Sequence, residues 1–185
     1  IGKGSFGEVL KIRDKETGEI YAAKIGFKSL DEETKDSKIN LAREVNLLSQ
    51  LKHPSILKFI GYSPYNFEKK NKPIIITEYS STGSLFDILE LERNGQAPYE
   101  WDSTKKLINI YGISSAMSYL HLNNIIHRDL KPHNILEDDH LFPKIGDFGL
   151  SKVYHQNLES MTIQSTVGFK GTPIYIAPEI WKSNQ

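Results

Sequence analysis

Residues 127–134 read HRDLKPHN, and the apolar pair Ile135 and Leu136 follows directly. This segment places an acid, Asp129, and an amide, Asn134, within one short turn-rich stretch. Thirteen residues after Asn134 comes DFG at 147–149, a second carboxylate in a tight turn with apolar neighbours. One aspartate to accept a proton, with an asparagine and an aspartate to hold cations, is what in-line phosphoryl transfer requires. A charged surface loop is the alternative for 127–134 alone, and the DFG downstream disfavours it.

The bulk composition is that of an ordinary soluble globular protein. Of 185 residues, 38% are hydrophobic and 25% are charged, which is enough for one good-sized core or two smaller lobes. The 23 basic and 23 acidic residues cancel, so no net charge draws the chain to nucleic acid or to an anionic membrane. The absence of cysteine excludes disulfides and thiolate metal sites, which suits an intracellular setting. No run approaches the ~20 apolar residues of a membrane span, and we expect no secretory leader.

The first 79 residues read as strands around one helix. Glycines at 2–7 lie inside an alternating apolar pattern and a second strand is predicted over 19–25, so two antiparallel strands fold over a flexible glycine tip. After a polar loop predicted over 26–37, an amphipathic helix that ends before Pro54 is indicated by the helical spacing of Leu41, Val45, Leu48 and Leu51. Two further strands and their exposed, lysine-rich connection are predicted over 56–62, 73–79 and 66–72.

From residue 80 onward the pattern becomes helical. Residues 80–83 form a short flexible joint, and we place the domain boundary there, between residues 1–79 and residues 80–185. A short helix containing Leu85 is closed by Asn94-Gly95, and a longer helix starts near Asp102 or Ser103. The longer helix is predicted to carry, on one face, Leu107, Ile110, Tyr111, Ser114, Met117 and Leu120. The polar stretch 151–170 is predicted to be mobile. The fold class is therefore α+β, a small β-rich lobe with one main helix joined to a mostly helical lobe.

Glycines near the start of the chain can cradle phosphates, because they let backbone N–H groups approach the oxygens closely. The pattern consists of Gly2, Gly4 and Gly7, followed by Val9. A plain hairpin turn and a dinucleotide-binding fingerprint are the alternatives. The fingerprint needs a helix directly after the glycines, whereas residues 8–12 alternate like a strand. A glycine flap between two strands is the better interpretation.

Lys24 and Glu44 are the next candidates. A lone lysine on a strand is usually just solvated, and the same holds for a glutamate beside the apolar stripe of a helix. Their pairing makes sense if the lysine holds the α- and β-phosphates of a nucleotide while the glutamate fixes the lysine rotamer. The small Ala22 would leave room for a flat base nearby.

Asp129 is the predicted catalytic base, which takes or orients the hydroxyl proton of the substrate. A metal-binding role is the alternative for Asp129, but Asn134 and Asp147 are better placed for metal. Lys131 supplies positive charge where the transferred γ-phosphoryl develops negative charge. His127 is predicted to be structural rather than an acid–base group.

A final motif consists of Gly171-Thr172-Pro173 and Ala177-Pro178-Glu179, and Ala177 comes thirty residues after the aspartate of DFG. With it, the chain resembles a eukaryotic protein kinase catalytic domain over essentially all 185 residues, with every motif in family order. The resemblance implies a two-lobed fold with ATP and Mg²⁺ in the cleft, and protein substrates that carry serine or threonine. It also implies that the chain starts inside the glycine motif and ends before further helices of the larger lobe, so we expect the isolated fragment to be poorly stable.

The resemblance implies roles for individual residues. Lys24 and Glu44 resemble the lysine–glutamate pair of the active state, and Asn134 and Asp147 resemble the metal ligands. Thr77 resembles the gatekeeper, and the backbones of Glu78 and Ser80 resemble the hinge that contacts adenine. The residues that resemble the two sides of the adenine slot are Val9, Ala22 and Leu136. Those that resemble the regulatory spine are Leu48, Phe59, His127 and Phe148.

The acceptor class and the regulation are also read from the resemblance. Lys131-Pro132 and Gly171-Thr172-Pro173 are similar to serine/threonine kinases, and the region around Thr77 and Gly83 looks like the tyrosine-kinase-like group of them. Arg128 suggests control by a phosphate on the activation segment, added by an upstream kinase or by autophosphorylation. Gly168 stands where many relatives carry the phosphorylated threonine, so the candidates are Thr162, Ser165 and Thr166. A tyrosine kinase or dual specificity stays open, as does a pseudokinase-like binding module, although a pseudokinase usually lacks one of the residues Lys24, Asp129, Asn134 and Asp147.

Overall fold

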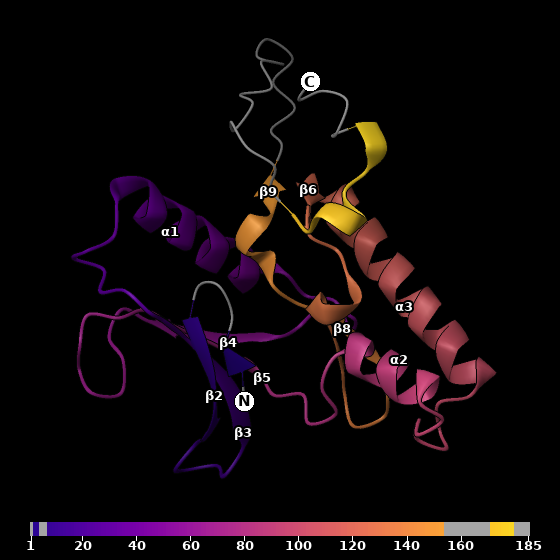
Figure 1. Ribbon diagram of the computed structural model, residues 1–185. Coiled ribbons are helices and arrows are strands. Elements are labelled where there is room, and N and C mark those ends of the chain that lie inside the picture. The colour runs from indigo at the N-terminus through magenta and orange to yellow at the C-terminus, as the bar shows by residue number, and fades with distance from the viewer. Residues whose placement is uncertain (1, 4–6, 154–170, 180–185) are drawn as a thin grey trace.

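The computed structural model describes residues 2–3, 7–153 and 171–179. A five-stranded antiparallel sheet fills one part of the molecule, in the order β1-β2-β3-β5-β4. Its strands are Gly2–Lys3 (β1), Gly7–Arg13 (β2), Ile20–Gly26 (β3), Phe59–Ser63 (β4) and Ile74–Glu78 (β5). Figure 1 shows this sheet and helix α1 on one side of the molecule, and helices α2 and α3 on the other. The predicted α+β class is confirmed.

The predicted pair of antiparallel strands at the start of the chain is also confirmed. β2 and β3 pair over seven residues each, with Val9 opposite Lys24. Alternation along β3 buries Ala23 and Ile25 in a small core on one face of the sheet. Ala22 and Lys24 therefore point to the opposite face, where the candidate site lies.

Helix α1 runs from Lys35 to Gln50 and ends before Pro54, as predicted. Its first three residues, 35–37, lie inside the segment 26–37, which was expected to be loop. The reason is a helix cap: the Thr34 hydroxyl accepts a hydrogen bond from the Ser37 N–H at 3.2 Å, which satisfies an otherwise unpaired donor of the first turn. The helix buries Leu48 in the main core, and Leu41, Val45 and Leu51 pack against it.

The strand predicted over 56–62 begins later than expected, at Phe59. Ile56 forms instead an isolated parallel bridge with Ile145, and the Leu57 N–H donates to the Ile145 carbonyl at 2.9 Å. Residues 55–57 are thus held by a partner almost ninety positions later in the chain. Local alternation could not reveal this, because the pairing is non-local.

The two predicted helices of the second half are present. Helix α2 spans Leu85–Arg93, is capped by Ser84 and Asp87, and ends at Asn94 before Gly95, whose φ is +71°. Helix α3 spans Ser103–Leu122, with Asp102 accepting a hydrogen bond from the Lys105 N–H at 2.8 Å.

The predicted apolar face of α3 is confirmed at Leu120, which is buried, and at Met117, which packs against the core, but it is wrong for the residues nearer the start of the helix. Leu107, Ile110 and Tyr111 are 66%, 62% and 74% exposed, whereas the helix buries Asn109, Gly112, Ala116 and Leu120. The helix carries apolar residues on several sides, so periodicity alone did not select the face that packs. Gly112 is required where it stands, because a Cβ there would lie 2.7 Å from the Pro143 ring.

Short strands and turns follow α3 and carry the residues of 127–134 and DFG. The strands are Ile125–Ile126 (β6), Ile135–Glu137 (β7), Pro143–Ile145 (β8) and Lys152–Val153 (β9), paired as β6 with β9 and β7 with β8. Single 3₁₀ turns are formed by Pro132–Asn134 (η1), Phe148–Leu150 (η2) and Pro173–Tyr175 (η3). The main core joins α1, α3 and these strands, and includes the buried residues Leu48, Leu120, Ile135, Ile145 and Phe148.

Some expectations fall outside the described residues. These are residues 154–170 of the stretch 151–170 that was predicted to be mobile, the candidate phosphorylation sites Thr162, Ser165 and Thr166, and the phosphate-binding role of Gly4. The start of that stretch is described and forms strand β9. Within the part of the chain that the structure describes, no helix has the length and apolar character needed to cross a bilayer.

The burial pattern of α3 can be tested with two leucines of the same helix. Leu120 is fully buried, so Leu120→Ala should lower the free energy of unfolding by about 2–5 kcal/mol. Leu107→Ala should change it by no more than about 0.5 kcal/mol, because that side chain is largely exposed. Urea titration of both variants measures the difference, and equal losses would contradict the observed face of α3.

Candidate active site

A cavity of about 870 Å³ lies between the sheet and the strands that follow α3. It is lined by ten of the residues that sequence analysis proposed, namely Gly2, Val9, Ala22, Lys24, Glu44, Thr77, Ser80, Asn134, Leu136 and Asp147. Gly7, Glu78, Asp129 and Lys131 are not among the lining residues. The Glu78 carboxylate points elsewhere, accepting a hydrogen bond from the Lys58 N–H at 2.7 Å. Among the lining residues that were not anticipated as site residues are Tyr79, Ser81 and His133.

Lys24 joins three elements at the back of the cavity. Its Nζ lies 3.7 Å from Oε1 of Glu44 on α1 and 3.3 Å from Oδ1 of Asp147, just before η2. Burial alone would lower the pKa of Lys24, but the negative charges of Glu44 and Asp147 outweigh it and raise the pKa. Burial raises the pKa of Glu44, and Lys24 only partly offsets that rise. Lys24 is therefore held as a cation facing the cavity.

Asp147 adopts a left-handed backbone conformation, with φ 55° and ψ 70°. Arg128, in the first stretch discussed above, has φ +67°. Such a conformation costs roughly 1–2 kcal/mol per residue, less for Asp than for most residues. Asp147 is thereby turned towards Lys24 and the cavity, while Phe148 is buried in the core. Arg128 Nε donates to the carbonyl of Leu150, which ties the segment after Asp147 to residues 127–134.

Asp129 is nearly buried and its carboxylate is held by donors on both oxygens. Oδ1 accepts from the backbone N–H and from the hydroxyl of Thr172, each at 2.9 Å. Oδ2 accepts from Nδ2 of Asn134 and from Nζ of Lys131, also at 2.9 Å each. Burial alone would raise the pKa of Asp129, but these hydrogen bonds together with the Lys131 charge lower it below its usual value. Asp129 is therefore ionised at neutral pH.

Thr172 is a partner of Asp129 that sequence analysis did not identify as such. Its hydroxyl also accepts from Lys131 Nζ at 2.6 Å, so Thr172, Lys131 and Asp129 form a closed network. Gly171 permits this approach, because its φ is +119° and a Cβ there would lie 2.9 Å from the Arg128 carbonyl. The available signal in the sequence was a hydroxyl residue, Thr172, directly after a glycine, Gly171.

His127 is 1% exposed and makes two polar contacts. Nε2 donates to the Gly146 carbonyl at 2.9 Å, and Nδ1 accepts from the Asp129 N–H at 3.3 Å, so the ring is the neutral Nε2–H tautomer. Burial lowers the pKa of His127, which keeps it neutral. Its ring packs edge-on to Phe148 with 5.0 Å between centroids. This geometry suits a supporting residue beneath Asp129 rather than an acid–base group.

Asn134 and Asp147 offer oxygen donors to the cavity from two sides. Both N–H groups of Asn134 are used, because Nδ2 donates to the carbonyl and to the carboxylate of Asp129. The remaining Oδ1 of Asn134 is an acceptor, as is the Asp147 carboxylate, so the donor set is an amide oxygen and a carboxylate. Among the described residues, no group of three or more His, Cys, Asp or Glu forms a complete metal cage. A few oxygen donors beside a phosphate ligand suit Mg²⁺, which keeps waters and binds through one or two carboxylates.

The sequence of the chain is similar to those of known proteins. The family model for the protein kinase domain matches residues 1–185. The chain is 37% identical over 180 residues to the serine/threonine-protein kinase sgk-1 of Caenorhabditis elegans, covering 97% of this chain and 36% of that protein. It is 36% identical over 186 residues to the RAC family serine/threonine-protein kinase homolog of Dictyostelium discoideum, covering 100% of this chain and 38% of that protein. The chain thus spans less than two-fifths of either relative.

The network around Asp129 predicts how its acidity depends on Thr172. Thr172→Ala should raise the pKa of Asp129, because one hydrogen bond to the carboxylate is lost. Thr172→Ser, the matched control, keeps the hydroxyl and should leave the pKa near the original value. Carboxyl ¹³C NMR titration of Asp129 measures both variants. If Asp129 titrates identically in Thr172→Ala, the hydroxyl does not stabilise the carboxylate.

Proposed function

The chain belongs to the protein kinase domain family, and from this premise we propose that it transfers the γ-phosphoryl group of ATP to serine or threonine hydroxyls of protein substrates. The observation that carries the proposal is the convergence of Lys24, Glu44, Asn134 and Asp147 on one cavity, with Asp129 hydrogen-bonded to Asn134 at its edge. These are the charged and metal-binding side chains that phosphoryl transfer needs, and they come from four separate segments of the chain.

ATP would bind in the cavity with its base between Val9 and Ala22 on one side and Leu136 on the other. All three line the cavity, and the backbone from Glu78 to Ser80 would supply hydrogen bonds to the base, beside the gatekeeper Thr77. Lys24 would hold the α- and β-phosphates, with Glu44 fixing its position. Gly2, Gly4 and Gly7 would cover the phosphates as a glycine flap.

Mg²⁺ would be held by Asn134 and Asp147, and when bound it neutralises charge that develops on the phosphates. Asp129 would accept or orient the proton of the substrate hydroxyl as its oxygen forms a bond to the γ-phosphorus and ADP leaves. Lys131 Nζ, 2.9 Å from Asp129, would stabilise negative charge on the transferred group. The lowered pKa of Asp129 keeps it ionised and able to accept this proton.

The acceptor class rests on the sequence around Asp129 and on the relatives. Lys131-Pro132 and Gly171-Thr172-Pro173 favour serine and threonine, and Lys131 and Thr172 contact one another. Both relatives described above are named serine/threonine kinases. Within that class we place the chain in the tyrosine-kinase-like group, because residues 75–79 and 83–85 resemble that group.

The wider setting is part of the same proposal. Residues 1–79 and 80–185 would form the two lobes. The protein would be intracellular, in the cytoplasm, where ATP is abundant, and would act in signal transduction. The partners would be the protein substrates, with no nucleic acid among them. The enzyme would be activated by phosphorylation, either by an upstream kinase or by itself. Arg128 is the residue expected to pair with an activating phosphate.

Removing single charges should separate binding from chemistry. Asp129→Asn should lower kcat by a factor on the order of 10²–10⁴ while ATP still binds, because the residue acts on the acceptor proton. Asp147→Ala should abolish transfer because a metal ligand is lost, and Asp31→Asn, an exposed aspartate outside the cavity, should have no effect. The assay follows phosphate transfer to mixed serine, threonine and tyrosine peptides.

Each alternative function has its own outcome in that assay. Phosphate on tyrosine alone would show a tyrosine kinase. Nucleotide binding without transfer to any peptide would indicate a pseudokinase-like binding module. Full activity in Asp147→Ala would reject the assignment of that carboxylate as a metal ligand.

A further inference from the structure

Glu137 is a fully buried acid that the proposed chemistry does not use. It ends strand β7, is 0% exposed, and neither oxygen of its carboxyl group has a hydrogen-bond partner. Burying an ionised carboxylate without partners is among the most costly arrangements in a protein interior. The carboxyl group of Glu137 is therefore expected to be in a form other than the ionised one.

Asn109 on α3 lies close enough to interact with the Glu137 carboxyl group, and its own hydrogen bonds indicate which form that group takes. Both N–H groups of Asn109 are used, because Nδ2 donates to the carbonyls of Lys105 at 3.3 Å and of Leu141 at 3.0 Å. Its Oδ1 is buried and has no partner. These two carbonyls also fix the orientation of the amide, since an inverted amide would place oxygen against oxygen. Glu137 can satisfy Asn109 only as a donor, which requires a protonated carboxyl group.

The backbone of Glu137 is tied to the wall of the cavity. Its N–H donates to the Gly83 carbonyl at 2.9 Å, and its carbonyl accepts from the Ser80 hydroxyl. The preceding residue, Leu136, forms an isolated bridge with Ser84 and lines the cavity. Because Ser80 and Gly83 also line the cavity, Glu137 connects that wall to α3.

The charged groups around Glu137 do not neutralise it. Lys105 on α3 directs Nζ to the His140 carbonyl at 2.7 Å, and Asp138 is the next residue along the chain. On β8, Lys144 lies 3.8 Å from Glu78, and on α2, Asp87 caps its own helix. Burial raises the pKa of Glu137 to about 7, and Asp138 adds to the rise. A hydrogen bond from Asn109 to the ionised carboxylate and the charge of Lys105 would oppose the rise, but both N–H groups of Asn109 are already taken by the carbonyls of Lys105 and Leu141.

We propose that Glu137 is a positioning residue, which as a neutral acid donates a hydrogen bond to Oδ1 of Asn109 and thereby holds the Ser80–Gly83 wall of the cavity against α3. Ionisation of Glu137 breaks this hydrogen bond and loosens the wall. The effect on nucleotide affinity rests on the proposed function, whereas the effect on stability does not.

The sign of the pH effect follows from the raised pKa. The folded protein holds the proton of Glu137 up to about pH 7, whereas the unfolded chain releases it near its ordinary value of 4.5. The stabilising contribution is therefore full below pH 4.5 and is lost as the pH rises through the range between the two values. Glu137→Gln removes the titration and keeps an N–H donor for Asn109.

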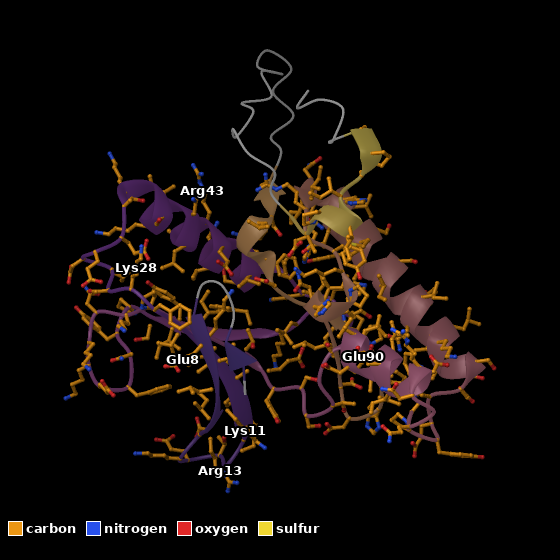
Figure 2. All side chains as sticks on the ribbon, viewed as in Figure 1. Glu8, Lys11, Arg13, Lys28, Arg43 and Glu90 are labelled. Atoms are coloured by element: carbon orange, nitrogen blue, oxygen red, sulfur yellow. The ribbon has the colours of Figure 1, made fainter. Side chains whose placement is uncertain are left out.

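The test compares the full chain with Glu137→Gln by urea unfolding at pH 5, 6.5 and 8. Relative to Glu137→Gln, the unfolding equilibrium constant of the original protein should rise on the order of tens of fold between pH 5 and pH 8. The matched control, Glu90→Gln, changes an exposed glutamate on α2 (Figure 2) and should follow the original protein at every pH. The Kd for ATP should weaken with pH in the original protein relative to Glu137→Gln.

Parallel pH dependences in the original protein and in Glu137→Gln would overturn the proposal. If Glu137→Gln does not fold, carboxyl ¹³C NMR of the original protein decides. A Glu137 signal that titrates near pH 7 supports the proposal, and one that titrates near 4.5 overturns it. If the stability changes with pH as predicted but neither the original protein nor Glu137→Gln binds ATP, the neutral state of Glu137 is supported and the proposed function is rejected.

Discussion

The ammonium group of Lys24 is the point on which the arrangement of the cavity depends. It comes from the central part of the sheet, and its two carboxylate neighbours come from helix α1 and from the turn at Asp147. These elements are far apart in the sequence, and the cation links the helix and the turn to the sheet, while Leu48 and Phe148 pack in the same core. The attraction acts in a partly buried site, where charges interact more strongly than in water. A strand of the sheet, a helix and a loop thus meet at Lys24 in the lining of the cavity.

The second organising group is the carboxylate of Asp129, which is linked to the cavity by its hydrogen bond from Asn134. All its hydrogen bonds come from within the second half of the chain, from Asn134, Lys131 and Thr172. Left-handed backbone at Arg128 and Asp147 is retained on either side of this network. Such conformations persist only where surrounding contacts outweigh their cost. The buried His127 ring, which bonds to both segments, supplies part of that support.

The elements that were predictable from sequence are those with local signals. The pairing of β2 with β3 follows from alternation around a glycine turn, and α2 follows from its capping residues and closing Gly95. The buried face of α3 was not predictable, because Leu107 and Leu120 are equally apolar and only tertiary packing distinguishes them. The same holds for the bridge of Ile56 to Ile145 and for the contact of Thr172 with Asp129, 43 residues apart. Glu137 carried no signal at all, since nothing local shows that a glutamate after two apolar residues will be buried.

We propose that Lys24, Asn134 and Asp147 together bind one metal–nucleotide complex in the cavity. Crystals grown with a non-hydrolysable ATP analogue and Mn²⁺, in place of Mg²⁺, test it directly through the anomalous scattering of manganese. We expect a manganese peak bound to both Asn134 and Asp147, with the phosphates of the analogue against Lys24. An ordered nucleotide at another place, or a manganese peak that touches neither side chain, would contradict it.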